Sequence, residues 1–196
     1  MINFLGLCVL NLIKTIKYIL GGNAKMRSIL STAAMISYDS LPIALSIVFI
    51  AAVVIALQVS KQFLMSGAES YVGGFLAVAL IRELAPGFAA LAISARAGTA
   101  ISAEIANMKV TSQVDAIKTL KVDPVGYYFA PRIISGAFTV PMVVILAELF
   151  GVLGGMIISY YTIDLHPNRY MTSVWQWINT RDLYISVFKG FIFGII

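Results

Sequence analysis

Long apolar segments, separated by polar ones, make up most of the chain after residue 39. Residues 40–60 form an uncharged run of 21 residues, long enough to cross the ~30 Å hydrocarbon core of a bilayer as a helix. A second apolar segment covers residues 67–98, and a third covers residues 133–163. Residues 183–196 begin a fourth that is too short to cross, so we expect the chain to be truncated at its C-terminal end. The pattern predicts four spanning helices, the fourth incomplete.

The first 38 residues have a different pattern. Apolar residues recur at helical spacing from Phe4 to Ile19, the basic residues are offset from them, and no acid occurs among residues 1–38. This predicts an amphipathic helix that lies in the membrane interface and ends near Gly21. A short spanning helix is the alternative, but its uncharged part, residues 1–13, is short for a span. We therefore divide the chain into an interfacial helix, residues 1–38, and a transmembrane domain, residues 39–196.

The composition agrees with a membrane protein and excludes several other classes. Of the 196 residues, 60% are hydrophobic and 12% are charged; with a mean hydropathy of +0.91, the chain is far more apolar than a soluble domain needs to be. The formal net charge of +5 is typical of loops that face anionic headgroups, and we expect no nucleic-acid binding. One cysteine, Cys8, and one histidine, His166, exclude a disulfide framework and a Cys/His metal cluster. The predicted fold class is an all-α integral membrane protein.

Basic residues also set the expected orientation. Residues 1–38 and 105–132 both carry an excess of Lys and Arg, and two crossings between them place both segments in the cytoplasm. Residues 164–182 are then a polar loop at the opposite surface, where their Tyr and Trp side chains fit an aromatic belt.

Within the predicted cytoplasmic segment, residues 111–120 have the pattern of a short amphipathic helix. Ser112 is expected to cap its N-terminus, with Asp115 near the positive end of the helix dipole. The Asp123-Pro124 pair ends this helix and opens the next element. One face carries the apolar residues Val114, Ile117 and Leu120. Such a helix either docks into a groove on a soluble partner or rests on the headgroups, and the pattern does not choose between them.

Four charges lie in the otherwise apolar segment 82–104: Arg82, Glu83, Arg96 and Glu104. A charge at the centre of a spanning helix costs roughly 2.5–3.5 kcal/mol on translocon scales, and it is tolerated where it pairs, lines a polar path or reaches the surface. We predict one charge network that serves structure and gating. Arg82 and Glu83 are adjacent and lie on different helix faces, so each needs a partner elsewhere. Glu148, in the third span, faces either a salt-bridge partner or substrate.

Two glycine pairs, Gly151-x-x-x-Gly155 and Gly190-x-x-x-Gly194, allow close helix packing, within one chain or between two copies. Pro141 is expected to kink the third span.

No phosphate-binding Gly-rich motif occurs, so any ATP is bound by another chain. Carboxylates are dispersed and no histidine partners a serine nucleophile, so we expect no catalytic residue, no metal site and no cofactor.

A series of short motifs occurs in one unbroken order along residues 40–196. Its members include Arg82-Glu83-Leu84-Ala85-Pro86, Ala95-Arg96-Ala97-Gly98-Thr99-Ala100, Ala103-Glu104-Ile105, residues 111–117, Val122-Asp123-Pro124, Pro131-Arg132, Asp182 and Lys189. The series resembles the MlaE/YrbE family of ABC-transporter permeases. The chain departs from the family pattern at Ser112, where the family usually carries Glu, and at Ala95 and Ala106, where Gly is common.

The resemblance implies a five-span permease that works as a homodimer with a cytoplasmic ABC ATPase subunit and an MCE-domain lipid-binding protein. It implies that 111–120 is a coupling helix, whose expected ATPase contacts are Ser112, Gln113, Asp115, Ala116, Ile117 and Leu120. The expected substrate is a phospholipid or related lipid, with Arg96, Glu104 and Glu148 as candidate headgroup contacts. The expected location is a bacterial inner membrane or a plastid envelope.

Two other hypotheses remain open. One is a self-sufficient secondary transporter or channel that uses the carboxylates of Glu83, Glu104 and Glu148. The other is an intramembrane enzyme that acts on lipid, against which the shortage of His, Cys and clustered carboxylates counts.

Overall fold

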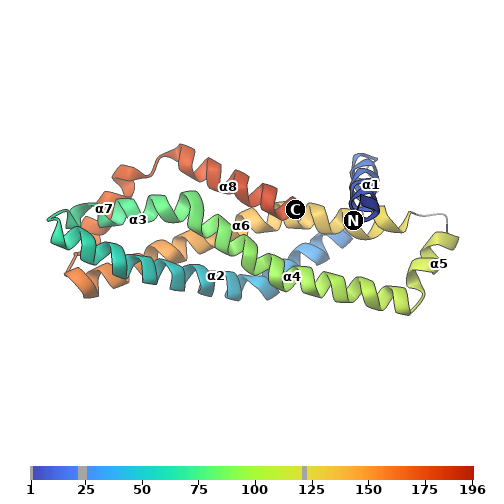
Figure 1. The fold of residues 1–196 in the computed structure, drawn as a ribbon, viewed down its shortest axis with the longest axis horizontal. Coiled ribbons are helices and arrows are strands. Elements are labelled where there is room, and N and C mark those ends of the chain that lie inside the picture. The colour runs from blue at the N-terminus through green and yellow to red at the C-terminus, as the bar shows by residue number, and fades with distance from the viewer. Residues whose placement is uncertain (1, 22–25, 121–122) are drawn as a thin grey trace.

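The computed structural model describes residues 2–21, 26–120 and 123–196, and all regular structure in these residues is helical. Three long helical segments run side by side along an elongated bundle, with α5 at one end and α7 at the other (Figure 1). The elements are α1 (Ile2–Leu20), α2 (Met26–Met65), η1 (Glu69–Tyr71), α3 (Val72–Ala79), the π-helix η2 (Leu80–Leu84), α4 (Ala85–Val110), α5 (Gln113–Thr119), α6 (Pro124–Ile163), α7 (Pro167–Trp177) and α8 (Thr180–Ile195).

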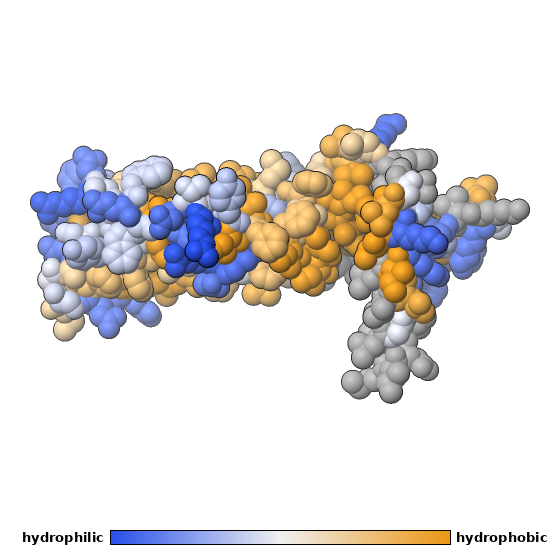
Figure 2. Space-filling view, turned by 90° about the horizontal axis from the view of Figure 1, so that it is seen from above, coloured by the Kyte–Doolittle hydropathy of each residue, from blue (hydrophilic) through white to orange (hydrophobic). Residues whose placement is uncertain are grey.

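Three segments are long and apolar enough to cross a membrane, as the sequence predicts: Met26–Met65, Glu69–Val110 and Pro124–Ile163. Each is much longer than a span requires, since 40 residues of α-helix measure ~60 Å at 1.5 Å per residue. The excess length carries the helices beyond the apolar core at the α5 end. On the face in Figure 2, hydrophobic residues cover much of the middle, while hydrophilic residues gather towards both ends.

Two helices extend past the positions at which the sequence places a boundary. Helix α2 begins at Met26 and passes without a break through residues 38 and 39, where the sequence places the end of the interfacial segment. Helix α4 continues to Val110, so only residues 111–123 connect the second and third spans, rather than the whole of 105–132. In both cases the helix persists past the apolar run, because its backbone hydrogen bonds are made within the segment whether or not lipid surrounds it.

Small side chains let α2 and α6 pack closely. Every fourth residue of α2 is buried on one face: Ser40, Ala44, Val48, Ala52, Ala56 and Ser60. A Cβ added at Gly151 of α6 would lie 3.3 Å from Val48, and one at Gly154 would lie 2.8 Å from the Phe49 ring, whereas Gly155 faces Leu76 of α3 and the Tyr170 hydroxyl. The Gly151-x-x-x-Gly155 pair therefore packs within one chain, against α2 and α3.

The second glycine pair also packs within the chain. Gly190 lies against Pro141, where an added Cβ would be 3.0 Å from the proline Cα, and Gly194 lies against the backbone of Gly136. Helix α6 continues through Pro141, and both Gly136 and Pro141 are buried where α6 contacts α8. These glycines hold α8 directly on α6.

Residues 164–182, expected to be a polar loop, contain helix α7. Its buried face carries Tyr170 and Val174, and it packs against α3, where Gly73 and Gly74 leave room for the Tyr170 backbone and the Trp177 ring. Trp175 points away and is exposed. The polar residues that resemble a loop in the sequence form the outer face of an amphipathic helix.

Helix α1 ends at Leu20, close to the expected end, and lies across the long axis of the bundle (Figure 1). Tyr18 covers Gly126 of α6, and Thr15 is buried. Leu10, Ile13 and Ile16 remain exposed. An apolar face left open beside basic residues is typical of a helix that lies in the membrane interface.

Candidate functional site

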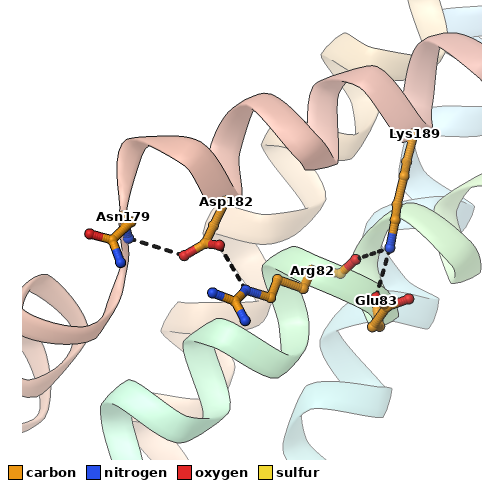
Figure 3. A network of polar contacts seen from close by, with 5 residues as sticks. All are labelled: Arg82, Glu83, Asn179, Asp182 and Lys189. Atoms are coloured by element: carbon orange, nitrogen blue, oxygen red, sulfur yellow. Dashed lines mark hydrogen bonds and ion pairs between the residues drawn. The ribbon is translucent and has the colours of Figure 1, made fainter.

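Polar contacts gather where the π-helix η2 meets the beginning of α8 (Figure 3). The Nε of Arg82 donates to the carboxylate of Asp182 at 2.7 Å. The other Asp182 oxygen accepts from the backbone N–H of Asn179 at 3.1 Å, as part of a capping box that starts α8. One buried carboxylate therefore both caps α8 and binds the second span.

Glu83 binds the same helix two turns further on. The Nζ of Lys189 lies 2.8 Å from the Glu83 carboxylate and donates to the backbone carbonyl of Arg82 at 2.6 Å. Figure 3 shows Arg82 and Glu83 reaching Asp182 and Lys189 on one side of α8. π-Helical turns are rare and often mark functional positions. The two adjacent charges thus each have a partner outside their own helix.

The remaining charges of segment 82–104 pair with other helices. Arg96 lies 3.7 Å from Asp39 of α2, and Glu104 lies 2.5 Å from Arg132 of α6. The single charge network expected from the sequence is therefore divided into separate pairs along the bundle. Together these pairs join the second span to α8, α2 and α6.

Glu148 is buried against α8. Its carboxylate accepts a hydrogen bond from the Ser186 hydroxyl. A hydroxyl, and not a cation, is therefore its recorded partner among the described residues, so the salt bridge considered from the sequence is not formed.

Helix α5 forms the tip of the bundle beyond the three spans (Figure 1). Val114 and Ile117 are half-buried, whereas Leu120 is exposed, together with Gln113, Asp115 and Ala116. Asp115 pairs with Lys118 at 2.9 Å on the exposed side. Asp123 then caps α6 by accepting from the Val125 N–H at 3.2 Å, as the sequence predicts.

The expected capping role of Ser112 is wrong in its detail. Ser112 does precede α5, but its φ of 57° places it in the left-handed region, and its side chain makes no capping hydrogen bond. The left-handed residue turns the chain sharply between α4 and α5. Its conformation therefore sets the angle of α5, at a cost of roughly 1–2 kcal/mol for a residue with a Cβ.

Two cavities lie in the half of the bundle towards α5, and Arg132 lines both. The apolar cavity, of about 260 Å³, lies among α2, α4, α6 and α8, and its walls include Ile36, Ile93, Gly98 and Ile133. The polar cavity, of about 660 Å³, lies among α2, α4, α5 and α6, and its walls include Ser31, Glu104, Ile117, Tyr127 and Tyr128. Among the described residues no group of three His, Cys, Asp or Glu could hold a metal ion.

Several partners in this site were missed by reasoning from sequence. Asp39 and Ser186 carry no signal of their own, and the Pro131-Arg132 motif does not reveal the partner of Arg132, because these roles depend on which helices touch. Asp182 does carry one: Asn179 and Asp182 have the spacing of a capping box ahead of an apolar run. That signal marks the start of α8 but not the arginine it binds.

Comparison with known proteins places these features in a family. The family described as Permease MlaE matches residues 29–196. A probable ABC transporter permease protein of Rickettsia prowazekii is 37% identical over 161 residues, which cover 82% of this chain and 62% of that protein. A probable ABC transporter permease protein of Synechocystis is 35% identical over 179 residues, which cover 91% of this chain and 68% of that protein.

A relative from a plant is named as a chloroplastic protein and after a lipid. The chloroplastic protein TRIGALACTOSYLDIACYLGLYCEROL 1 of Arabidopsis thaliana is 28% identical over 140 residues, 71% of this chain and 40% of that protein. The chain thus spans about two thirds or less of the length of these relatives. The three apolar spans and these relatives agree on a membrane location.

Proposed function

We propose that this chain, which belongs to the MlaE permease family, moves phospholipids or related lipids with energy from ATP hydrolysed by a partner subunit. The observation that carries the proposal is α5: a short, exposed helix that joins two spans and lies beyond their apolar part. The chain itself has no Gly-rich phosphate-binding motif. An ATPase must then act through a surface such as this one.

Lipid as the substrate class is supported by the plant relative and by the chemistry of the bundle. That relative is named after trigalactosyldiacylglycerol, a diacylglycerol lipid. The apolar cavity offers a wall for acyl chains, and the ion pairs offer polar contacts at several depths. The combination suits an amphiphile better than an inorganic ion.

The ion pairs suggest how movement at α5 reaches the rest of the bundle. Helix α4 begins directly after η2, where Arg82 and Glu83 hold α8, and it ends directly before α5. A push on α5 is therefore transmitted along α4 to the contacts with Asp182 and Lys189. In this proposal the charged side chains position the helices and gate their movement. Glu148 keeps its hydrogen bond with Ser186, and Arg96 keeps its ion pair with Asp39.

A homodimer and an MCE-domain partner complete the proposed assembly. The Glu83 side chain is 74% exposed on a segment that spans the membrane, and a charge facing lipid there is costly. A second copy of the chain or a wet cavity between copies would cover it. The MCE-domain protein would bind at the α7 end, opposite α5.

The experiment is assembly and transport by the full-length protein with its ATPase. Asp115→Ala and Ile117→Ser alter exposed and half-buried positions of α5, and Val54→Ala alters an exposed position of α2, between the two ends of the bundle, as a control. We expect the two α5 variants to lower ATPase copurification and ATP-driven lipid transfer between vesicles, and Val54→Ala to change neither. Unchanged assembly and transfer in both α5 variants would contradict the coupling role.

A simpler measurement distinguishes the proposed function from the alternative of a self-sufficient transporter. It predicts lipid or ion flux by the permease alone under an ion gradient, without ATP. The proposed function predicts no flux without the ATPase.

A further inference from the structure

The two cavities in the α5 half of the bundle form an amphipathic pair. The apolar cavity is walled mainly by Ala, Ile, Val and Phe side chains, whereas the polar cavity has hydroxyls, tyrosines, Glu104 and Arg132 in its wall beside apolar residues such as Met35, Met108 and Ile117. Both have walls on α2, α4 and α6, and Arg132 lies between them. The polar cavity, at about 660 Å³, is within the range of roughly 300–1,000 Å³ that is usual for small-molecule sites.

The charges in the polar cavity match a zwitterion. Arg132 and Glu104 both line it, and their opposite charges face it together. Tyr127 and Tyr128 line the same cavity, the Arg132 guanidinium lies 5.9 Å from the centre of the Tyr128 ring, and aromatic faces attract cationic groups such as an ammonium. A ligand with only a negative charge would be opposed by Glu104, while one with both charges finds a partner for each.

Arg132 also has an unused donor. Its two terminal nitrogens bind the Tyr128 carbonyl at 2.6 Å and the Glu104 carboxylate, but its Nε is buried without a hydrogen-bond partner. A buried N–H without an acceptor is unfavourable. A phosphate that draws the guanidinium towards the cavity would therefore supply an acceptor to a group that lacks one, and Glu104 would be released to an ammonium.

We propose that these cavities bind one zwitterionic phospholipid of the cytoplasmic leaflet, with its headgroup between Arg132 and Glu104 and an acyl chain in the apolar cavity. The inference rests on the proposed function and adds a site to it. Gln113, Ala116 and Ile117 of α5 line the headgroup cavity, so the bound lipid touches the helix proposed to meet the ATPase. Lipid occupancy and ATPase engagement are thereby coupled.

Two glycines of α4 provide a test that leaves the ion pair intact. Gly98 lines the apolar cavity and Gly87 does not, yet an added Cβ meets no atom within 4 Å at either position. Gly98→Leu therefore fills the acyl cavity, and Gly87→Leu is the matched control on the same helix. Neither is expected to disturb folding.

The probe is phosphatidylethanolamine with a diazirine on its acyl chain, in nanodiscs that hold the full-length protein. After illumination, peptide mass spectrometry should find label on Ile101 and Ile133, lost in Gly98→Leu and retained in Gly87→Leu. The same diazirine on phosphatidylglycerol, which lacks the ammonium, should label less. Glu104→Gln should reduce the preference for phosphatidylethanolamine by about threefold, the effect of losing one partly exposed ion pair.

Equal labelling in Gly98→Leu and the unaltered protein would overturn the site, and so would equal labelling by both lipids. ATP-driven lipid transfer is measured on the same variants, to separate this site from the proposed function. Transfer without specific labelling contradicts only the site. Specific labelling without ATP-driven transfer supports the site and contradicts the function.

Discussion

Asp182 offers a way to weigh the ion pair that holds α8 against the second span. Asp182→Asn keeps an oxygen for the Asn179 N–H but removes the charge that faces Arg82. Breaking a fully buried pair costs about 3–5 kcal/mol. The Arg82 side chain is 48% exposed, however, so its guanidinium regains other contacts and we expect a loss of about 1–2 kcal/mol. Asp182→Ala also removes the cap, which adds about 1 kcal/mol.

The assay is the free energy of unfolding of the full-length protein in mixed micelles, measured by denaturant titration. Asp115→Asn is the matched control, because Asp115 pairs with Lys118 on an exposed helix face. An exposed pair of this kind contributes less than about 0.5 kcal/mol. The difference between the two Asp→Asn variants then reports the effect of burial.

A double-mutant cycle completes the measurement. Arg82→Gln and Asp182→Asn share one contact, so their combined cost should be smaller than the sum of the single costs by about 0.5–2 kcal/mol. The reasoning is refuted if the two changes add, or if Asp182→Asn costs no more than Asp115→Asn. In either case the Arg82–Asp182 pair does not hold α8, which is then held by its other contacts, the Glu83–Lys189 pair and the glycine seam among them.

Three further predictions use the same unfolding measurement. Gly136→Ala should lower the free energy of unfolding by about 1–3 kcal/mol, because a Cβ there collides with the Gly194 backbone. Gly87→Ala, with open space around its Cβ, should leave the free energy of unfolding unchanged or raise it by up to about 1 kcal/mol. Burial raises the pKa of the Tyr170 hydroxyl, so above pH ~10 the unfolded chain loses this proton first and stability falls as the pH rises; Tyr170→Phe should flatten that fall, and an unchanged slope would contradict the assignment. Ser112→Gly should stabilise by up to about 1 kcal/mol by relieving its left-handed conformation, and destabilisation would show that the hydroxyl has a role the geometry does not reveal.

The predicted and observed site agree where the physics is local. The cost of charge in a bilayer singles out Arg82 and Glu83, and their adjacency requires separate partners, which Asp182 and Lys189 supply. Local reasoning failed at Ser112, because a serine ahead of a helix resembles a cap whether or not the backbone turns left-handed. It failed again for residues 164–182, where the outer face of α7 reads as a loop.

By itself the sequence determined that the chain lies in a lipid bilayer, that it is helical, where its three spans are and where α5 lies. Each of these depends on runs of apolar or polar residues within one segment. Its motif order also identified the family. The tertiary structure decided which helices meet. Pairs such as Glu104 with Arg132, the burial of Glu148 against Ser186 and the two cavities that Arg132 lines join residues 28 or more positions apart. Such contacts depend on how small residues let whole helices approach, and no single segment encodes that.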